Sequence, residues 1–375
     1  MNIAIFTDTF LPSINGVVTS IVNLSRELGK KGHNVMIITS ITKKKSKIDL
    51  GKNISIVRYK TLGLIKYPDF QLTAPNPFIL NKIRDFKTDV IHSHMPSLLG
   101  WQALVCSKIF NVPIVGTYQT FLPGFVDCFP ILAKFKNSFV QDIIWGYTKM
   151  YYNACDKITT LSHAMKDELI KNNIKSVDVV SDGVDLNNFY PRDTKKDGKT
   201  ILQVGRISCE KNVDVTVRAF KILLKNIPDA KLIIAGSGPD LKKIKEMASD
   251  CKNIKLLGAV DHEKLPKIYS KADLFVTAST IEVEGLVILE AMACGLPIVG
   301  VDALAIPTIV AHEKNGFIAK PYNEEEIAKY MFLLLNKKEL RQSFGKKSTE
   351  IVKKYSLEKT ADKFEKIYKL LIDKR

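Results

Sequence analysis

The sequence predicts an α/β protein of two Rossmann-like domains, each built on a mostly parallel sheet, that face a central cleft. Three observations predict this fold. The chain has 375 residues, which is long for a single hydrophobic core. Short runs rich in β-branched and aliphatic residues alternate with helical patterns, as parallel strands joined by helices do. The alternation stops at residues 191–199, PRDTKKDGK, and then begins again.

The individual elements follow from this alternation. In the first half the predicted strands are NIAIFTD, NVMIITS, ISIVRY, DVIHSH, PIVGTY, KITTLS and VDVVSDG. In the second half they are TILQVG, KLIIAG, IKLLGA, LFVTAS and PIVGVD. We therefore expect an N-terminal domain at residues 1–190 and a C-terminal domain at 198–355. Residues 356–375 are predicted to form a helix that belongs to neither alternation.

The net charge is the unusual feature of the composition. The chain is 46% hydrophobic and 25% charged, as in ordinary globular proteins, but its formal net charge is +17. A positive net charge of this size favours anionic partners: nucleic acid, an acidic lipid surface or phosphorylated small molecules. The six cysteines have no metal-ligand spacing and are expected to be reduced thiols of a cytosolic protein. With neither a signal sequence nor a long apolar run, membrane contact is expected to be peripheral.

The most informative stretch is IEVEGLVILEAMACG, residues 281–295. It follows a predicted strand, so Glu282 is expected in a strand-to-helix loop at the carboxyl edge of the sheet. Leu286 and Val287 begin the helix, where free backbone N–H groups can bind an anion. One turn further, Glu290 could accept two hydrogen bonds from a diol such as a ribose. The alternative is a capping acid and a solvent-facing helix residue.

Other candidate ligand groups also follow predicted strands. Arg206 and Lys211, in VGRISCEKN, suit a diphosphate, although lysine is abundant in this chain. Gly16 opens a helix, where a glycine lets a phosphate approach the backbone closely. His94 ends a strand, and catalytic and structural roles are equally open for it. The chain contains no Asp-x-Asp, so protein cations rather than a metal would stabilise a diphosphate leaving group.

Taken together, these motifs resemble those of the retaining GT-B glycosyltransferases of the glycosyl transferase group 1 type, over essentially the whole chain. The Glu-x7-Glu signature is matched by Glu282 and Glu290, the most specific element. Further matches are Gly205-Arg206 with Lys211, His92 with His94, Asn15-Gly16, and the segment 182–185, DGVD.

The resemblance implies a binding site for a nucleotide sugar. Arg206 and Lys211 would hold the donor diphosphate, and Gly16 would lie against it. Glu290 would bind the ribose, and the loop at Val260 would lie near the base. The final helix would cross back onto the N-terminal domain.

It also implies groups around the transferred sugar. Glu282 would contact this sugar, with backbone groups of Gly285, Leu286 and Val287 around it, and His94 would lie beside it. Two departures from the family pattern concern the same pocket. Glu284 stands where Phe or Gln is frequent, and Gln119 stands in TYQT where His is common.

The acceptor is expected to be a membrane lipid. The opening TDTFLPSINGVVTSIVNLSREL most resembles that of bacterial diacylglycerol glucosyltransferases, and the basic charge suits an anionic membrane. The segment 121–136 is expected to contact the membrane or acceptor through Phe121, Leu122, Phe125, Lys134 and Lys136. The alternative is that these residues pack inside the domain. The helically spaced Phe135, Phe139, Ile143, Tyr147 and Tyr151 are interpreted as core.

The expected function is retaining transfer of a hexose, glucose from UDP-glucose, to an acceptor such as 1,2-diacylglycerol. The enzyme would need no metal and would bind the inner face of the plasma membrane from the cytoplasm. One alternative is a soluble or polysaccharide acceptor, or phosphatidylinositol with a GDP-sugar. A nucleic-acid-binding protein is suggested only by charge, and the aromatic–basic interleaving that would support it is missing.

Overall fold

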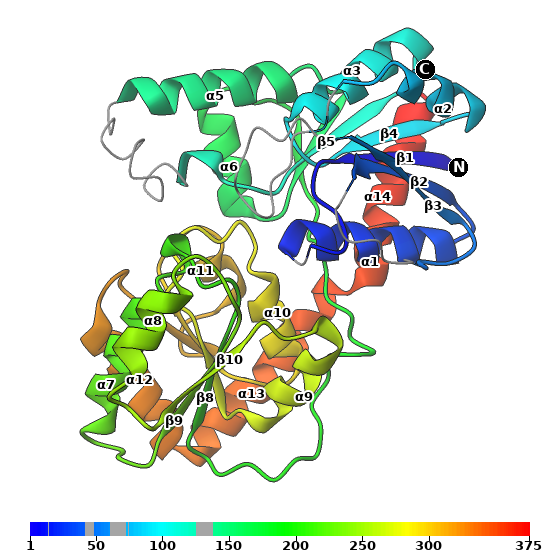
Figure 1. The fold of residues 1–375 in the computed structure, drawn as a ribbon. Helices are drawn as coiled ribbons and strands as arrows, with labels where there is room; N and C mark the ends of the chain where they lie inside the picture. Colours follow the sequence, from blue (N-terminus) through cyan, green and yellow to red (C-terminus); the bar gives the residue numbers. More distant parts are fainter. Residues whose placement is uncertain (14, 42–48, 61–72, 74, 125–137) are drawn as a thin grey trace. The chain divides into compact units, whose positions relative to one another are not determined.

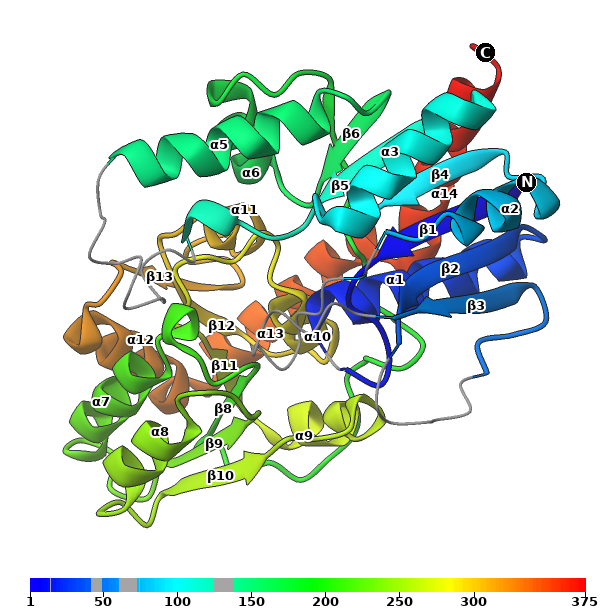
Figure 2. The same ribbon diagram turned by 45° about the horizontal axis from the view of Figure 1, so that its top comes forward.

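The computed structural model describes residues 1–13, 15–41, 49–60, 73, 75–124 and 138–375. These residues form two compact units. Unit 1 contains the described residues from Met1 to Pro123, those from Ser138 to Asp182, and the segment Leu357–Arg375. Unit 2 contains Gly183–Ser356 together with Gly124. Figure 1 shows both units as α/β folds, and Figure 2 shows the same chain turned.

Unit 1 is built on a seven-stranded sheet in which every pair of neighbouring strands is parallel. The strand order is β3-β2-β1-β4-β5-β6-β7, so the order reverses between β1 and β4. The strands are β1 (Asn2–Thr7), β2 (Asn34–Ser40), β3 (Ile54–Tyr59), β4 (Val90–Ser93), β5 (Ile114–Tyr118), β6 (Lys157–Thr160) and β7 (Val177–Val179).

The helices of unit 1 cover both faces of this sheet (Figure 2). They are α1 (Gly16–Lys30), α2 (Phe78–Asp85), α3 (Leu98–Phe110), α5 (Ser138–Tyr152), α6 (His163–Lys171) and α14 (Leu357–Ile372). Side chains of Asn15, Ser97 and Ser162 accept hydrogen bonds from the first turns of α1, α3 and α6, which fixes where these helices begin. Helix α14 buries Phe364 and Tyr368 in the same core as α1, so the end of the chain completes unit 1.

Unit 2 repeats this plan with a six-stranded parallel sheet in the order β10-β9-β8-β11-β12-β13. Its strands are β8 (Thr200–Val204), β9 (Lys231–Ala235), β10 (Ile254–Gly258), β11 (Leu274–Val276), β12 (Ile298–Val301) and β13 (Gly316–Ala319). All the strands predicted from the sequence are present. Strand β13 was not predicted, because it has only four residues and follows Asn315 with a glycine, a pair typical of turns.

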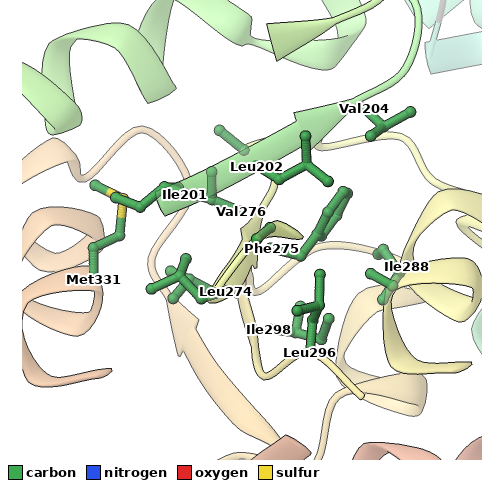
Figure 3. Close-up of a cluster of buried hydrophobic side chains, with 14 of the residues drawn as sticks. Ile201, Leu202, Val204, Leu274, Phe275, Val276, Ile288, Leu296, Ile298 and Met331 are labelled. Carbon is green, nitrogen blue, oxygen red and sulfur yellow. The ribbon is translucent and has the colours of Figure 1, made fainter. Parts of the chain in front are cut away.

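The sheet of unit 2 lies between two groups of helices (Figure 1). The helical segments are η2 (Cys209–Lys211), α7 (Val213–Leu224), α8 (Leu241–Ala248), η3 (His262–Lys264), α9 (Leu265–Lys271), α10 (Leu286–Ala293), α11 (Ile306–Ile309), α12 (Glu324–Asn336), α13 (Lys338–Val352) and η4 (Lys353–Tyr355). Figure 3 shows part of the core between strands and helices, including Ile201, Leu202, Leu274, Phe275, Ile288, Ile298 and Met331. This continuous apolar core holds the loops at the carboxyl edge in place.

The cysteines depart from expectation at one position. Cys106, Cys155, Cys251 and Cys294 are free thiols, as their spacing indicates. Cys209 is disulfide-bonded, so the prediction of reduced cysteines is wrong for this residue. Spacing along the chain does not reveal which sulfur atoms meet in space. Within the described ranges, no helix combines the length and apolar character needed to cross a bilayer.

Candidate active site

His94 lies where the strand order of unit 1 reverses. It follows β4, and its backbone N–H donates to the carbonyl of Phe6 at the end of neighbouring β1, at 3.1 Å. In open parallel sheets, this point of reversal at the carboxyl edge is where ligands bind. The side chain of His94 is only 2% exposed. The fold therefore puts the predicted histidine in a ligand-binding position and shields it from bulk water.

The two ring nitrogens of His94 differ in their surroundings. Nδ1 lies 3.2 Å from Oε1 of Gln119. Nε2 is buried and makes no hydrogen bond to any residue that the structure describes. Burial lowers the pKa of His94 to about 4, against the weaker opposing effect of the Gln119 hydrogen bond. At neutral pH the imidazole is uncharged.

Gln119 belongs to a buried polar cluster that sequence reasoning did not assemble. Its Nε2 donates to Asp182 Oδ1 at 2.9 Å and to Ser20 Oγ at 3.1 Å. The Ser20 hydroxyl in turn donates to the same Asp182 oxygen at 2.5 Å. Burial raises the pKa of Asp182 to about 7, although both hydrogen bonds act to lower it. Residues from three distant segments therefore meet behind His94.

His92, the first histidine of the pair, has a structural position. Its Nε2 lies 2.5 Å from Thr117 Oγ1, and its Nδ1 lies 2.7 Å from the hydroxyl of Tyr368 in α14. Both nitrogens are thus used by the protein, and the ring is fully buried. His92 links the sheet to α14, whereas His94 keeps one nitrogen available.

Gly16 is the first residue of α1 and is exposed. The side chain of Asn15 caps this helix by accepting from the backbone N–H of Val18 at 3.0 Å. Among the residues that the structure describes, no atom lies within 4 Å of a Cβ placed on Gly16, so their packing does not require a glycine here. The helix start is therefore open to a ligand, as the predicted role of Gly16 needs.

Unit 2 carries its candidate groups at the corresponding point, between β8 and β11. Arg206 follows β8, Lys211 ends η2, and Glu282 lies in the loop after β11. Lys211 Nζ and Glu282 Oε1 are 2.6 Å apart, with side chains 26% and 10% exposed. Asn212 fastens the two loops together by donating to the carbonyl of Ala278 at 3.1 Å. The predicted diphosphate and sugar ligands are therefore neighbours.

The helix after Glu282 is preceded by a glycine in the left-handed backbone conformation. Gly285 has φ +89°, and a Cβ there would lie 2.9 Å from Cδ1 of Ile288. A side chain at this position would be opposed by both backbone conformation and packing. Leu286 and Val287 follow as the first residues of α10 and are half-buried. Their N–H groups precede the first intrahelical bonds, which makes this helix start a candidate anion site beside Glu282.

Glu290 is 2% exposed, so the alternative of a solvent-facing helix residue is wrong. Oε1 lies 2.8 Å from Nε2 of His262, and Oε2 accepts from the Tyr269 hydroxyl at 2.9 Å. Burial disfavours protonation of His262, but the hydrogen bond and charge of Glu290 outweigh it and raise the His262 pKa. A carboxylate oxygen accepts more than one hydrogen bond, so an oriented Glu290 can still bind a diol.

The loops after β8, β9 and β10 pack against one another through glycines that the sequence analysis did not single out. A Cβ on Gly236 would lie 1.8 Å from the carbonyl oxygen of Gly205, and one on Gly238 would lie 2.2 Å from that of Ile207. The Gly236 N–H donates to Gly258 at 2.8 Å. Val260, in the third loop, is half-buried. Backbone groups therefore form much of this edge.

The predicted membrane segment is only partly described. Phe121 and Leu122 are half-buried, and the Phe121 ring lies 6.2 Å from that of Trp145. The other three predicted contacts lie outside the described residues: Phe125, Lys134 and Lys136.

The interpretation of the helically spaced apolar residues of α5 as core is partly wrong. Tyr151 is fully buried, but Ile143 is 55% and Tyr147 37% exposed. Phe135 and the side chain of Phe139 lie outside the described part of the chain. Hydrophobic spacing marks one face of α5, but it does not say whether another element covers that face.

The neighbouring helix α3 also exposes apolar residues. Trp101 of α3 donates from Nε1 to the Tyr147 hydroxyl of α5 at 3.0 Å, so the two helices are neighbours. Further along them, Val105 is 50%, Ile109 58% and Met150 58% exposed. We call Val105, Ile109, Ile143, Tyr147 and Met150 the α3/α5 face. Apolar side chains gathered on one surface commonly mark a site of contact with a membrane or another protein.

Two Rossmann-like units, each with candidate ligand groups where its strand order reverses, are the architecture of GT-B glycosyltransferases. Two protein-family models match the chain. The model described as Glycosyltransferase Family 4 matches residues 14–188, and the model described as Glycosyl transferases group 1 matches residues 187–351. The chain is a hexosyltransferase with a glycosyl transferases group 1 domain at residues 187–351.

Individual relatives agree with this assignment. The alpha-monoglucosyldiacylglycerol synthase of Acholeplasma laidlawii is 28% identical, over 100% of this chain and 98% of the relative. A GDP-mannose-dependent alpha-mannosyltransferase of Corynebacterium glutamicum is 27% identical, over 85% of this chain and 76% of the relative. The solved structure of Alr3699/HepE from Anabaena in complex with UDP-glucose has a TM-score of 0.78 and 15% identity. The match covers 99% of this chain and 100% of that one.

Proposed function

We propose that this enzyme transfers glucose from UDP-glucose to a membrane lipid such as 1,2-diacylglycerol, with retention of the anomeric configuration. The observation that carries the proposal is the pairing of Lys211 with Glu282 beside the start of α10. A cation, helix N–H groups and a carboxylate that lie side by side support the binding of a sugar diphosphate. The sugar and acceptor are inferred from the glucosyldiacylglycerol synthase relative.

Donor binding is assigned to unit 2. Arg206 and Lys211 would neutralise the diphosphate, and the backbone of Leu286 and Val287 would donate to it. Glu290, already oriented by its protein partners, would accept hydrogen bonds from the ribose hydroxyls. The loop at Val260 would border the base. Gly16, at the open start of α1, would lie against the diphosphate from unit 1.

Transfer breaks the bond between the anomeric carbon and the diphosphate oxygen and forms one to the acceptor hydroxyl oxygen. UDP departs with the electron pair of the broken bond, and the proton of the acceptor hydroxyl passes to a phosphate oxygen of the departing UDP. Arg206 and Lys211 would stabilise the charge that develops on UDP, so the reaction would need no metal. Glu282 would hold hydroxyl groups of the sugar, and His94 would accept a hydrogen bond from it through Nε2.

Membrane attachment is assigned to unit 1. The net charge of +17 would draw the protein to an anionic surface, and the α3/α5 face would add apolar contact. Phe121, Leu122, Phe125, Lys134 and Lys136 would contribute from the segment 121–136. The enzyme would thus work in the cytoplasm, peripherally bound to the inner face of the plasma membrane.

A second candidate keeps the same site but changes both substrates. The mannosyltransferase relative has GDP-mannose in its name, which favours a GDP-sugar. The acceptor would then be phosphatidylinositol or a soluble or polysaccharide molecule. The two candidates would differ in the pocket that binds the nucleotide base and in the residues that bind the acceptor. The residues that bind the diphosphate would be the same in both reactions.

A screen of donors against acceptors tests the proposal. Purified enzyme would be given UDP-glucose, other UDP-sugars or GDP-mannose, with diacylglycerol in anionic liposomes, phosphatidylinositol or a soluble sugar acceptor. We expect transfer from UDP-glucose to diacylglycerol, and an α-linked product by NMR of the anomeric proton. Transfer only from GDP-mannose, or only to soluble acceptors, would favour the second candidate. A β-linked product would contradict retention.

A further inference from the structure

The cluster behind His94 constrains the direction of its hydrogen bonds. The amide nitrogen of Gln119 has two acceptors, Asp182 Oδ1 and Ser20 Oγ, at 2.9 and 3.1 Å. The hydroxyl hydrogen of Ser20 is used by the same Asp182 oxygen at 2.5 Å. These two acceptors are hydrogen-bonded to each other and lie in nearly the same direction from the nitrogen, so they determine which way the NH2 group points. The amide oxygen of Gln119 is left to face His94.

This orientation determines where His94 carries its hydrogen. Oε1 of Gln119, 3.2 Å from Nδ1, is an acceptor only. Nδ1 must therefore be the protonated nitrogen of the neutral ring, and Nε2 must present its lone pair. In the opposite orientation Gln119 would turn its NH2 group away from Asp182 and Ser20, lose its hydrogen bonding to them, and place its own oxygen against the Asp182 oxygen. The tautomer thus follows from a carboxylate that does not touch the histidine.

We propose that Asp182, Ser20 and Gln119 are positioning residues that hold His94 in the Nδ1–H tautomer, so that buried Nε2 is a ready acceptor for a substrate hydroxyl. The substrate part rests on the proposed function of His94, whereas the tautomer itself does not. The buried Nε2, without a partner in the described residues, is what a ligand acceptor needs. A histidine with only a structural role, such as His92, has both nitrogens engaged.

The cluster also gives a role to the departure in TYQT. A histidine at position 119 could itself change tautomer or charge, whereas an amide has a fixed donor end and a fixed acceptor end. Once Asp182 and Ser20 orient the donor end, the acceptor end is determined. Gln119 therefore passes on the orientation set by Asp182 without taking a proton.

The test is the tautomer of His94 by long-range proton–nitrogen NMR on the full chain labelled at its histidines. The His94→Gln variant assigns the signal. In the wild type we expect Nδ1–H. In Gln119→Leu, which lacks the acceptor, and in Asp182→Ala, which frees the amide, the ratio of Nδ1–H to Nε2–H should fall about tenfold or more. If Asp182→Ala does not fold, Ser20→Ala replaces it and should shift the ratio in the same direction.

Asp156→Ala is the matched control, because this aspartate also accepts from its own unit but lies before β6, at the opposite edge of the sheet. It should leave the ratio unchanged. A His94 that stays Nδ1–H in Gln119→Leu, or in whichever of the Asp182 and Ser20 variants folds, would overturn the proposal. Transfer rates separate the two ideas. If the tautomer of His94 shifts in these variants but the transfer rate does not fall, Asp182, Ser20 and Gln119 do position His94. The role proposed for His94 in transfer would then be wrong.

Discussion

Lys211 Nζ lies 2.6 Å from Oε1 of Glu282, so the cation proposed for the diphosphate and the carboxylate proposed for the sugar form an ion pair. The two residues come from loops on opposite sides of the strand reversal, after β8 and after β11. The Glu282 side chain is 10% exposed, and a buried carboxylate without its cation is costly. Each residue therefore holds the other in place before a donor binds.

Replacing Lys211 should consequently damage the site twice. In Lys211→Ala the diphosphate loses a cation, and Glu282 loses the partner that holds it. We expect kcat/KM for transfer to fall about 10²-fold or more. Lys243→Ala is the matched control, because it removes an exposed lysine of unit 2 that pairs with Asp214 at 2.9 Å. If Lys211→Ala behaves like this control, the diphosphate binds elsewhere.

The proposed metal independence can be tested with Arg206. If Arg206 and Lys211 stabilise the leaving diphosphate, transfer should continue in EDTA, and Arg206→Ala should lower kcat/KM about 10²-fold or more. Rates with EDTA, and with added Mg²⁺ or Mn²⁺, would be compared for the wild type and this variant. Strict dependence of the wild type on an added metal would contradict the assignment.

His94→Ala should separate transfer from nucleotide binding. His94 belongs to unit 1, while the proposed ligands of the ribose and most of those of the diphosphate belong to unit 2. We expect transfer to be nearly abolished and the affinity for UDP, measured by calorimetry, to stay almost unchanged. Parallel losses of both would indicate that the ring supports folding.

The buried His94 should also make stability depend on pH. Its pKa is about 4 in the folded protein, because burial disfavours the charged ring, and about 6.5 in the unfolded chain. Between these values the unfolded state binds more protons, so stability is full above about pH 6.5 and decreases toward pH 4. From pH 7.5 to pH 5 the loss from His94 should be about 2 kcal/mol.

His94→Gln should remove this contribution. Urea unfolding at both pH values, for wild type and variant, measures the free energy of unfolding. His92, whose pKa burial also lowers, is present in both proteins and cancels to first order. An equal loss of stability in wild type and His94→Gln would mean that His94 is not held neutral by burial.

Membrane binding should depend on the α3/α5 face. We expect reversible binding to liposomes that increases with anionic lipid and decreases with added NaCl, because each basic residue near the surface contributes about 1 kcal/mol. Replacing Ile143 and Met150 together by serine should weaken binding but not UDP affinity. Leu370→Ser, on α14 and 51% exposed, is the control. Equal binding to neutral and anionic liposomes at low salt would contradict the proposed electrostatic contribution to membrane binding.

Much of the fold could be predicted, because local patterns of hydrophobic and polar side chains indicate the parallel strands and the helices between them. The two histidines of DVIHSH show where such patterns end. They stand two residues apart, yet His92 is structural because Tyr368, 276 residues away, hydrogen bonds to it. Likewise Asp182 meets Ser20 across 162 residues. Contacts of this kind are set by packing, and one sequence contains no local signal for them.

The same limit applies in unit 2. The acidic signature identified Glu282 and Glu290, but the partners that orient Glu290 were missed. His262 lies on η3 and Tyr269 on α9, and neither belongs to a motif that is visible in the sequence. Burial was also misjudged along α5, since the apolar stripe at Ile143 and Tyr147 is left uncovered.

The hydrogen bond between Tyr368 and His92 has a consequence for biosynthesis. A ribosome that has translated residues 1–182 has produced every strand of the first sheet but not α14, whose Phe364 and Tyr368 fill its core. All of unit 2 must be translated before that helix emerges. The nascent first unit therefore spends the synthesis of about half the chain with part of its apolar interior uncovered, a natural point for chaperone engagement.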